Sequence, residues 1–213
     1  LLSIDALRYI STKKKPIILS TGMANLSEID QAIKILNTKS KKDIYLLHCV
    51  SSYPTKLENL NLKFMKKLNE TFNYPVGLSD HTEGEIAAIT AVSLGAKIIE
   101  KHITFNNNMS GPDHKASMSI NNFAKLVSKI REVEKALGKE KKIISKNELQ
   151  VSKALRKSCV SKRNIKKGEI LKKSDIVFKR PGVGISPMLF KKIVGKKIKR
   201  DIKRDKLFKW NMF

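Results

Sequence analysis

The chain of 213 residues is 41% hydrophobic and 30% charged, a composition that excludes an intrinsically disordered polypeptide. Its 44 Lys and Arg residues against 19 Asp and Glu residues give a net charge of +25, but aromatic residues that could stack on bases are few, so the sequence favours a solvated basic face over a nucleic-acid interface. No run of about 18 apolar residues and no secretory leader is found, so we expect a cytoplasmic protein without a membrane span.

Four short apolar runs, each followed by a helical pattern, organise residues 1–138. The predicted strands are Pro16–Leu19, Asp43–Leu47, Pro75–Leu78 and Ala96–Ile99, and the predicted helices run from about Asn25 to Leu36, Leu60 to Leu68, Gly84 to Leu94 and Ile120 to Leu137. Asn25 and Glu28 have the spacing of a capping box at the start of the first of these helices. Continuous apolar strands separated by helices predict a parallel sheet covered on both faces.

The residues at the ends of the predicted strands favour one of the two possible α/β fold classes. Each strand ends in Ser, Thr, His, Glu or Lys followed by a loop, which is typical of the catalytic rim of a (β/α)8 TIM barrel, with a doubly wound sheet as the alternative. Four units make half of such a barrel, which needs about 250 residues. The sequence therefore predicts an α/β fold, the C-terminal half of a TIM barrel, with four further strands preceding Leu1 or supplied by another chain.

The last third of the chain has a different pattern. Residues 139–157 are polar and charged and are predicted to form a linker. From Ser158 to Phe213 short strand-like runs alternate with turns, and helix-forming runs are nearly absent. We therefore expect a separate small β-rich domain over residues 158–213.

Two histidines follow neighbouring predicted strands. His81 comes after Pro75–Leu78, and His102 comes after Ala96–Ile99. Parallel strands joined by a right-handed helical crossover point the same way, so both imidazoles are expected at one edge of the sheet, where they could bind a divalent metal. Asp113, in a Gly-Pro-Asp turn, could reach the same pocket as a ligand or a base, whereas a hydrogen-bonded structural role is the alternative for each histidine.

Four further residues are candidates for substrate binding. Ser20, with Thr21 and Gly22, lies at a strand–helix junction that could bind an anion, although N-capping explains the same residues equally well. Ser79 and Tyr53 are expected at the same rim, where their hydroxyls could donate to a phosphate or a sugar. Arg180 lies between a strand and a Gly-rich turn and could clamp a carboxylate or polar ligand, or be one more solvated cation of a basic segment.

Several motifs together resemble a known family. In chain order they read ILSTGM, LLHCVSSYPT, VGLSDHT, IIEKHIT and GPDHKAS, followed by a small domain with KKGEIL and FKRPGVG. They resemble the C-terminal part of the bacterial sialic acid synthases, a family that includes the N-acetylneuraminate, N,N'-diacetyllegionaminate and pseudaminate synthases. The resemblance covers essentially the whole chain, and GPDHKAS is more similar to the neuraminate and legionaminate branch.

The resemblance implies a fold, a reaction and an assembly. The fold is a TIM barrel followed by an antifreeze-protein-like (SAF) domain, in a domain-swapped homodimer whose small domain caps the partner's active site. The family condenses phosphoenolpyruvate with N-acetylmannosamine or a related 2,4-diacetamido sugar, forming a nine-carbon 2-keto acid and releasing phosphate. A divalent metal, with Mn2+ expected and Mg2+ or Co2+ as alternatives, would polarise the sugar aldehyde as a Lewis acid.

The resemblance also assigns roles by position in this sequence. His81 and His102 match the family's metal ligands, and Asp113 matches an acidic residue that would orient the aldehyde or handle a proton. The positions that match substrate-binding groups are Ser20 and Ser79 around phosphoenolpyruvate, Tyr53 in the sugar pocket, and Arg180, which would reach across the dimer to the N-acyl group.

The chain also departs from the family. The family's first four strands, whose lysines hold phosphoenolpyruvate, are not part of this chain, so we expect it to be a truncated fragment that is inactive alone. Asn106 and Asn107 stand where an acidic and basic pair is expected, and Arg156 stands near the position of an aromatic contact with the partner's sugar. A non-catalytic binding or assembly module and another metal-dependent barrel aldolase or lyase are the alternative functions, and the acceptor sugar stays open.

Overall fold

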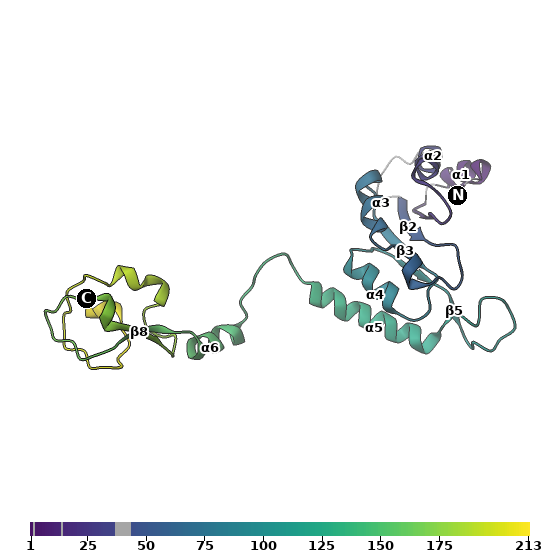
Figure 1. Ribbon diagram of the computed structural model, residues 1–213. Helices are drawn as coiled ribbons and strands as arrows, with labels where there is room; N and C mark the ends of the chain where they lie inside the picture. Colours follow the sequence, from purple (N-terminus) through teal and green to yellow (C-terminus); the bar gives the residue numbers. More distant parts are fainter. Residues whose placement is uncertain (2, 14, 37–43) are drawn as a thin grey trace. The chain divides into compact units, whose positions relative to one another are not determined.

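The computed structural model describes residues 1–213 except positions 2, 14 and 37–43 (Figure 1). The chain divides into two compact units, Leu1–Lys139 and Glu140–Phe213, which we call unit 1 and unit 2. Among the described residues, no helix has both the length and the apolar character needed to cross a bilayer.

Unit 1 is an α/β structure built on a curled, four-stranded parallel sheet. Its strands are β1 (Ile17–Ser20), β2 (Ile44–Cys49), β3 (Val76–Asp80) and β4 (Ile99–Lys101), hydrogen-bonded in that order. The helices are α1 (Ile4–Ser11), α2 (Leu26–Leu36), α3 (Phe64–Phe72), α4 (Ile86–Ser93) and α5 (Ile120–Leu137). Two short strands, β5 (Ile103–Thr104) and β6 (Met118–Ser119), pair beyond β4.

One face of the sheet packs against the helices. The main core joins apolar residues of α1 to α4 to alternate strand residues, which are Ile44 and Leu46 on β2 and Val76 and Leu78 on β3. Because successive side chains of a strand point to opposite faces, these residues define a single helix-covered face. The sequence predicted helices on both faces of the sheet. In the described part of unit 1 the helices of the main core cover one face, which is the arrangement expected of half a barrel.

The predicted start of α2 and limits of α5 are confirmed. The Asn25 side chain accepts from the Glu28 amide at 3.0 Å and the Glu28 carboxylate accepts from the Asn25 amide at 2.8 Å, so the capping box forms. α5 covers Ile120–Leu137 as predicted and ends at Gly138, whose φ is +55°. The helix predicted from Leu60 to Leu68 is wrong in its limits, because a 3-10 turn, η2 (Leu57–Asn59), and a positive φ at Asn61 delay α3 until Phe64.

Unit 2 contains little regular structure around its own core. Helix α6 (Lys146–Leu155) precedes an antiparallel pair, β7 (Ser158–Ser161) and β8 (Ile176–Lys179), and three 3-10 turns, η3 (Lys173–Asp175), η4 (Pro187–Lys192) and η5 (Trp210–Met212). Its core consists of Cys159, Ile165, Leu171, Ile185, Ile193, Ile198, Ile202 and Phe208. Residues 139–157, predicted to form a linker, include helix α6, which Ser145 caps by accepting from the Glu148 amide.

Candidate functional site

The two histidines meet at the C-terminal edge of the sheet. His81 follows β3 and His102 follows β4, and their ring centroids are 5.2 Å apart. The register of the two strands pairs Ser79 with Glu100, so the residues two positions further along each strand emerge side by side. The predicted convergence of the two imidazoles is therefore present in the structure.

The protonation of His81 leaves one ring nitrogen free for a ligand. His81 Nδ1 lies 2.9 Å from the Val50 carbonyl oxygen. Because a carbonyl oxygen can only accept, Nδ1 carries the proton and the lone pair of Nε2 is available to a metal. A backbone carbonyl that accepts from the other ring nitrogen is a common partner of a metal-binding histidine. His81 therefore has the free ring nitrogen that a ligand of a divalent metal ion needs.

Asp113 lies beside the second histidine. Its Oδ2 is 3.9 Å from His102 Nδ1, and its side chain is 57% exposed, so it faces open space next to the imidazole pair. The described residues contain no group of three or more His, Cys, Asp and Glu side chains that could hold a metal ion. The arrangement is thus a two-imidazole half-site with one accessible carboxylate next to it.

The carboxylate beside His81 in the sequence has a structural role. Asp80 Oδ2 accepts from Lys101 Nζ at 2.8 Å, with both side chains almost completely buried, and Asp80 Oδ1 accepts from the amide and the hydroxyl of Thr82, both at 2.8 Å. With its lone pairs committed in this way, Asp80 is not free to bind a metal. This ion pair could not be predicted from local sequence patterns, because the pairing depends on strand register.

Two predicted phosphoenolpyruvate-binding serines lie on the sheet face away from the helices. Ser79, which is buried, donates to Glu100 Oε1 at 2.6 Å. Ser20 ends β1, two strands from β3, and is exposed. Thr21 does not present its hydroxyl to a ligand, because it is buried and donates to the Leu47 carbonyl at 2.8 Å. Glu100 was not among the predicted site residues, although its place at the end of a strand was a usable indication.

Tyr53 contacts both histidines and the loop that carries Asp113. Its ring centroid is 4.4 Å from that of His102 and 5.4 Å from that of His81. Its hydroxyl lies 3.0 Å from Ser117 Oγ and 3.3 Å from the Asp113 carbonyl oxygen. Tyr53 is therefore part of the site, and Ser117, which the sequence analysis missed, ties it to the loop.

Hydrogen bonds within the loop between β5 and β6 hold its conformation. The Asn107 side-chain amide donates to the His114 carbonyl at 2.9 Å and to the Ser117 carbonyl at 2.7 Å. The Ser117 hydroxyl donates to the Asp113 carbonyl at 2.7 Å. Asn107 therefore holds the loop closed by neutral hydrogen bonds.

Arg180, the remaining predicted residue, belongs to unit 2. Its Nε donates to the Leu155 carbonyl at 2.9 Å, which fixes the start of its guanidinium against the end of α6. The side chain is exposed. Its assignment as a substrate-binding residue stays a prediction.

Comparisons with known proteins give matches over both units. A family model described as the NeuB family matches residues 1–142, and a SAF domain model matches residues 156–213. The chain is 47% identical over 205 residues to an uncharacterized protein of Methanocaldococcus jannaschii, covering 96% of this chain and 61% of that protein. It is 44% identical over 209 residues to the N,N'-diacetyllegionaminic acid synthase of Campylobacter jejuni, covering 97% of this chain and 63% of that protein.

A solved structure extends the comparison. The N-acetylneuraminic acid synthetase of Leptospira borgpetersenii aligns with a TM-score of 0.63 at 36% identity, over 70% of this chain and 52% of that chain. This chain spans somewhat more than half of the length of the curated relatives named above.

Proposed function

This chain belongs to the NeuB family and carries a SAF domain, and on that premise we propose that it provides the C-terminal half of the barrel of a sialic acid synthase. In the proposed reaction, the enol carbon of phosphoenolpyruvate forms a bond to the aldehyde carbon of N-acetylmannosamine or a 2,4-diacetamido sugar. Water then adds at the phosphate-bearing carbon, and phosphate leaves by C–O cleavage. The product is a nine-carbon 2-keto acid.

The pair of imidazoles with a free Nε2 on His81 is the observation that carries this proposal. His81 and His102 would hold a divalent ion, Mn2+ in our proposal, which supplies Lewis-acid polarisation of the aldehyde when bound. Asp113 stands on the open side of His102, where its carboxylate can orient the sugar or accept a proton from it. Tyr53 provides a ring wall to the same space.

The serines and Arg180 complete the proposed substrate contacts. Ser79 and Ser20, on the face of the sheet that the helices leave uncovered, would donate hydrogen bonds to phosphoenolpyruvate. Arg180 would contact the N-acyl group in a homodimer in which unit 2 of one protomer reaches the site of its partner. The 44% identity to a legionaminic acid synthase favours a 2,4-diacetamido sugar as the acceptor.

Complementation tests the proposal. The chain is combined with the N-terminal part of the Campylobacter jejuni synthase that precedes the matched region, and phosphate release is measured with Mn2+, phosphoenolpyruvate and either acceptor sugar. We expect turnover only with both parts present, and we expect its loss when His81→Ala and His102→Ala are introduced. A stable complex of the two parts that releases no phosphate with either sugar would refute the enzyme function and leave a non-catalytic module.

Metal binding is measured on the chain alone. Titration with Mn2+ followed by electron paramagnetic resonance should show one site that disappears in the double histidine variant. Equal binding by the variant would show that the imidazole pair does not hold the ion.

A further inference from the structure

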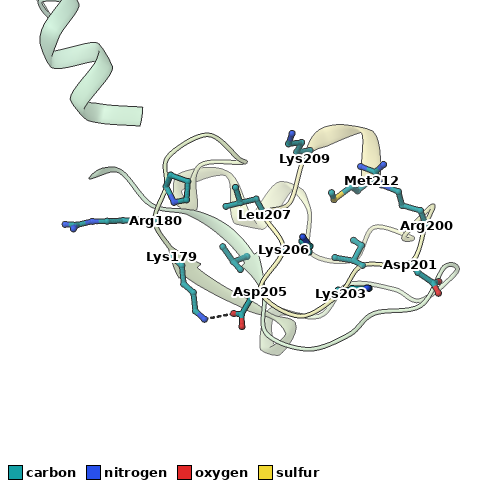
Figure 2. A pocket seen from close by; sticks show the side chains of 13 residues that line it. Lys179, Arg180, Arg200, Asp201, Lys203, Asp205, Lys206, Leu207, Lys209 and Met212 are labelled. Carbon is teal, nitrogen blue, oxygen red and sulfur yellow. Dashed lines mark hydrogen bonds and ion pairs between the residues drawn. The ribbon is translucent and has the colours of Figure 1, made fainter. Parts of the chain in front are cut away.

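Unit 2 contains a basic cavity, and Arg180 is the one residue of its lining that the proposed reaction uses. Its volume is about 580 Å3, within the range of about 300–1,000 Å3 typical of small-molecule sites. The lining comes mainly from the end of β8 and from residues 200–209, as Figure 2 shows. Six basic side chains line it, Lys179, Arg180, Arg200, Lys203, Lys206 and Lys209, against two acidic ones, Asp201 and Asp205.

Both acidic residues already have cationic partners. Asp205 accepts from Lys179 Nζ at 2.5 Å, and Asp201 accepts from the Lys167 amide at 2.8 Å and from Lys166 Nζ at 3.2 Å. The hydrogen bond from Lys179 holds the pKa of the Asp205 carboxyl below its usual range, and the bond from the Lys167 amide does the same for the pKa of Asp201. Neither carboxylate is therefore left to neutralise the other cations.

Four cations of the lining have no carboxylate partner among the residues that the structure describes. Lys203, Lys206 and Lys209 form no ion pair there, and Arg200 donates only to the neutral Asn211 side chain, at 3.1 Å. Arg180 is not one of this set, because its guanidinium is held by the Leu155 carbonyl and points away from the cavity in Figure 2. Four unpaired cations around one concavity focus a positive potential within it.

The backbone beneath these lysines is fixed by a buried hydroxyl. Ser161 is fully buried, and its Oγ donates to the Lys203 carbonyl at 2.7 Å and accepts from the Lys206 amide at 3.0 Å. The Ser161 carbonyl accepts from the Asp205 amide at 2.8 Å, and Asp205 has a positive φ of 61°. Because the turn is fixed before any ligand arrives, less ordering free energy is lost on binding.

The same cavity has an apolar part. Val160, Ile202, Leu207 and Met212 belong to its lining, and Val160 and Leu207 pair across a β-bridge. Val160 and Ile202 are buried, and Leu207 and Met212 are partly exposed. An inorganic ion would therefore contact only the cations, whereas an organic molecule could also cover Leu207 and Met212. The ligand that matches both parts has a multiply charged anionic group and a carbon skeleton.

We propose that this cavity binds a phosphorylated small organic molecule. The phosphate, which carries a charge of about −1.5 to −2 near neutral pH, lies among Arg200, Lys203, Lys206 and Lys209. The carbon skeleton lies against Leu207 and Met212. This site lies entirely within unit 2 and does not depend on the proposed synthase reaction.

The test is calorimetric titration of the full chain at about 0.15 M salt, where diffuse surface attraction is screened. The probes are a hexose 6-phosphate, the unphosphorylated hexose, inorganic phosphate and, as a probe of non-specific charge binding, duplex DNA. The cavity variant combines Lys206→Gln with Lys209→Gln and keeps the backbone bond to Ser161. The control variant combines Lys191→Gln with Lys192→Gln in η4, which makes the same charge change on exposed residues outside the cavity.

We expect the hexose phosphate to bind more tightly than inorganic phosphate, and the free hexose not to bind. The cavity variant should weaken hexose phosphate binding at least about tenfold, since it removes two charge-assisted contacts, while the control stays within about twofold. Trp210 fluorescence checks that unit 2 is folded, and Arg200→Gln replaces the double variant if it is not. Absence of hexose phosphate binding, or equal losses in both variants, would overturn the site. So would preferential binding of duplex DNA with equal losses in both variants.

Discussion

The buried ion pair between Asp80 and Lys101 should stabilise unit 1 and align the two histidines. Each partner directly precedes a histidine, and the register pairs Asp80 with Lys101 across β3 and β4. Besides this pair, Lys101 Nζ donates to the Thr82 carbonyl at 2.6 Å. The substitution Asp80→Asn removes the negative charge and leaves a buried ammonium group without its counter-ion.

The exposed fractions of the Asp80 and Lys101 side chains indicate how large the loss of stability should be. They are 0% for Asp80 and 2% for Lys101, so solvent cannot replace the missing partner. Loss of one member of such a pair costs about 3–5 kcal/mol, whereas replacing both with well-packed apolar residues of similar volume is often neutral. We therefore expect Asp80→Asn and Lys101→Met each to destabilise unit 1 by about 3 kcal/mol or more, and the double variant to cost much less than their sum.

Two spectroscopic signals report the unfolding of the two units separately in a urea titration. Far-UV circular dichroism is dominated by the five helices in the described part of unit 1, and fluorescence reports unit 2 through Trp210, the one tryptophan of the chain. The single variants should lower the dichroism midpoint and leave the fluorescence midpoint unchanged. Glu85→Gln is the control, since it breaks the partly exposed pair with Lys129 and should cost less than about 1 kcal/mol. A single variant that costs no more than this control, or a double variant that costs the full sum, would contradict the stabilising role of the buried ion pair.

Three further predictions concern the loop, the sheet and unit 2. Tyr53→Phe removes the hydroxyl contact with Ser117, so the Ser117 amide should exchange with deuterium several-fold faster, and unchanged exchange would contradict this link. Gly77→Ala places a Cβ 2.3 Å from a backbone carbonyl oxygen just before β4 and should cost about 1–3 kcal/mol in urea unfolding; a neutral effect would contradict it. Burial raises the pKa of Asp175, but hydrogen bonds from Arg163 and a backbone amide outweigh burial, and the pKa is lowered. The Asp175 contribution to stability should therefore be complete above about pH 4 and disappear as the pH falls further, and Asp175→Asn, followed by Trp210 fluorescence, should lack this dependence.

Local patterns were sufficient to predict most elements of unit 1. Apolar runs located β1 to β4, and the spacing of Asn25 and Glu28 predicted a capping box that forms with two hydrogen bonds. The meeting of His81 and His102 followed from the geometry of parallel strands alone. These features depend on residues close in sequence or on one rule of topology.

Contacts between distant segments were not predictable in the same way. The partners of Asp80 and Tyr53, Lys101 and Ser117, lie 21 and 64 residues further along the chain, so only the folded register and loop path bring them together. The limits of α3 depended on a positive φ at Asn61, a conformation that asparagine tolerates but does not require. In contrast, α6 was missed although Ser145 and Glu148 have the spacing of a helix start.

The alternation of side chains along β3 and β4 explains how two short segments combine stability and chemistry. Ser79 and Glu100 pair on one face of the sheet, and His81 and His102 continue that face two positions later. Asp80 and Lys101 occupy the positions between them and therefore point to the helix-covered face, where the ion pair is buried. A shift of one residue between the strands would turn the polar site residues of one strand to the helix-covered face and would also separate the ion pair. The cost of separating these charges thus fixes the register that brings the two imidazoles together.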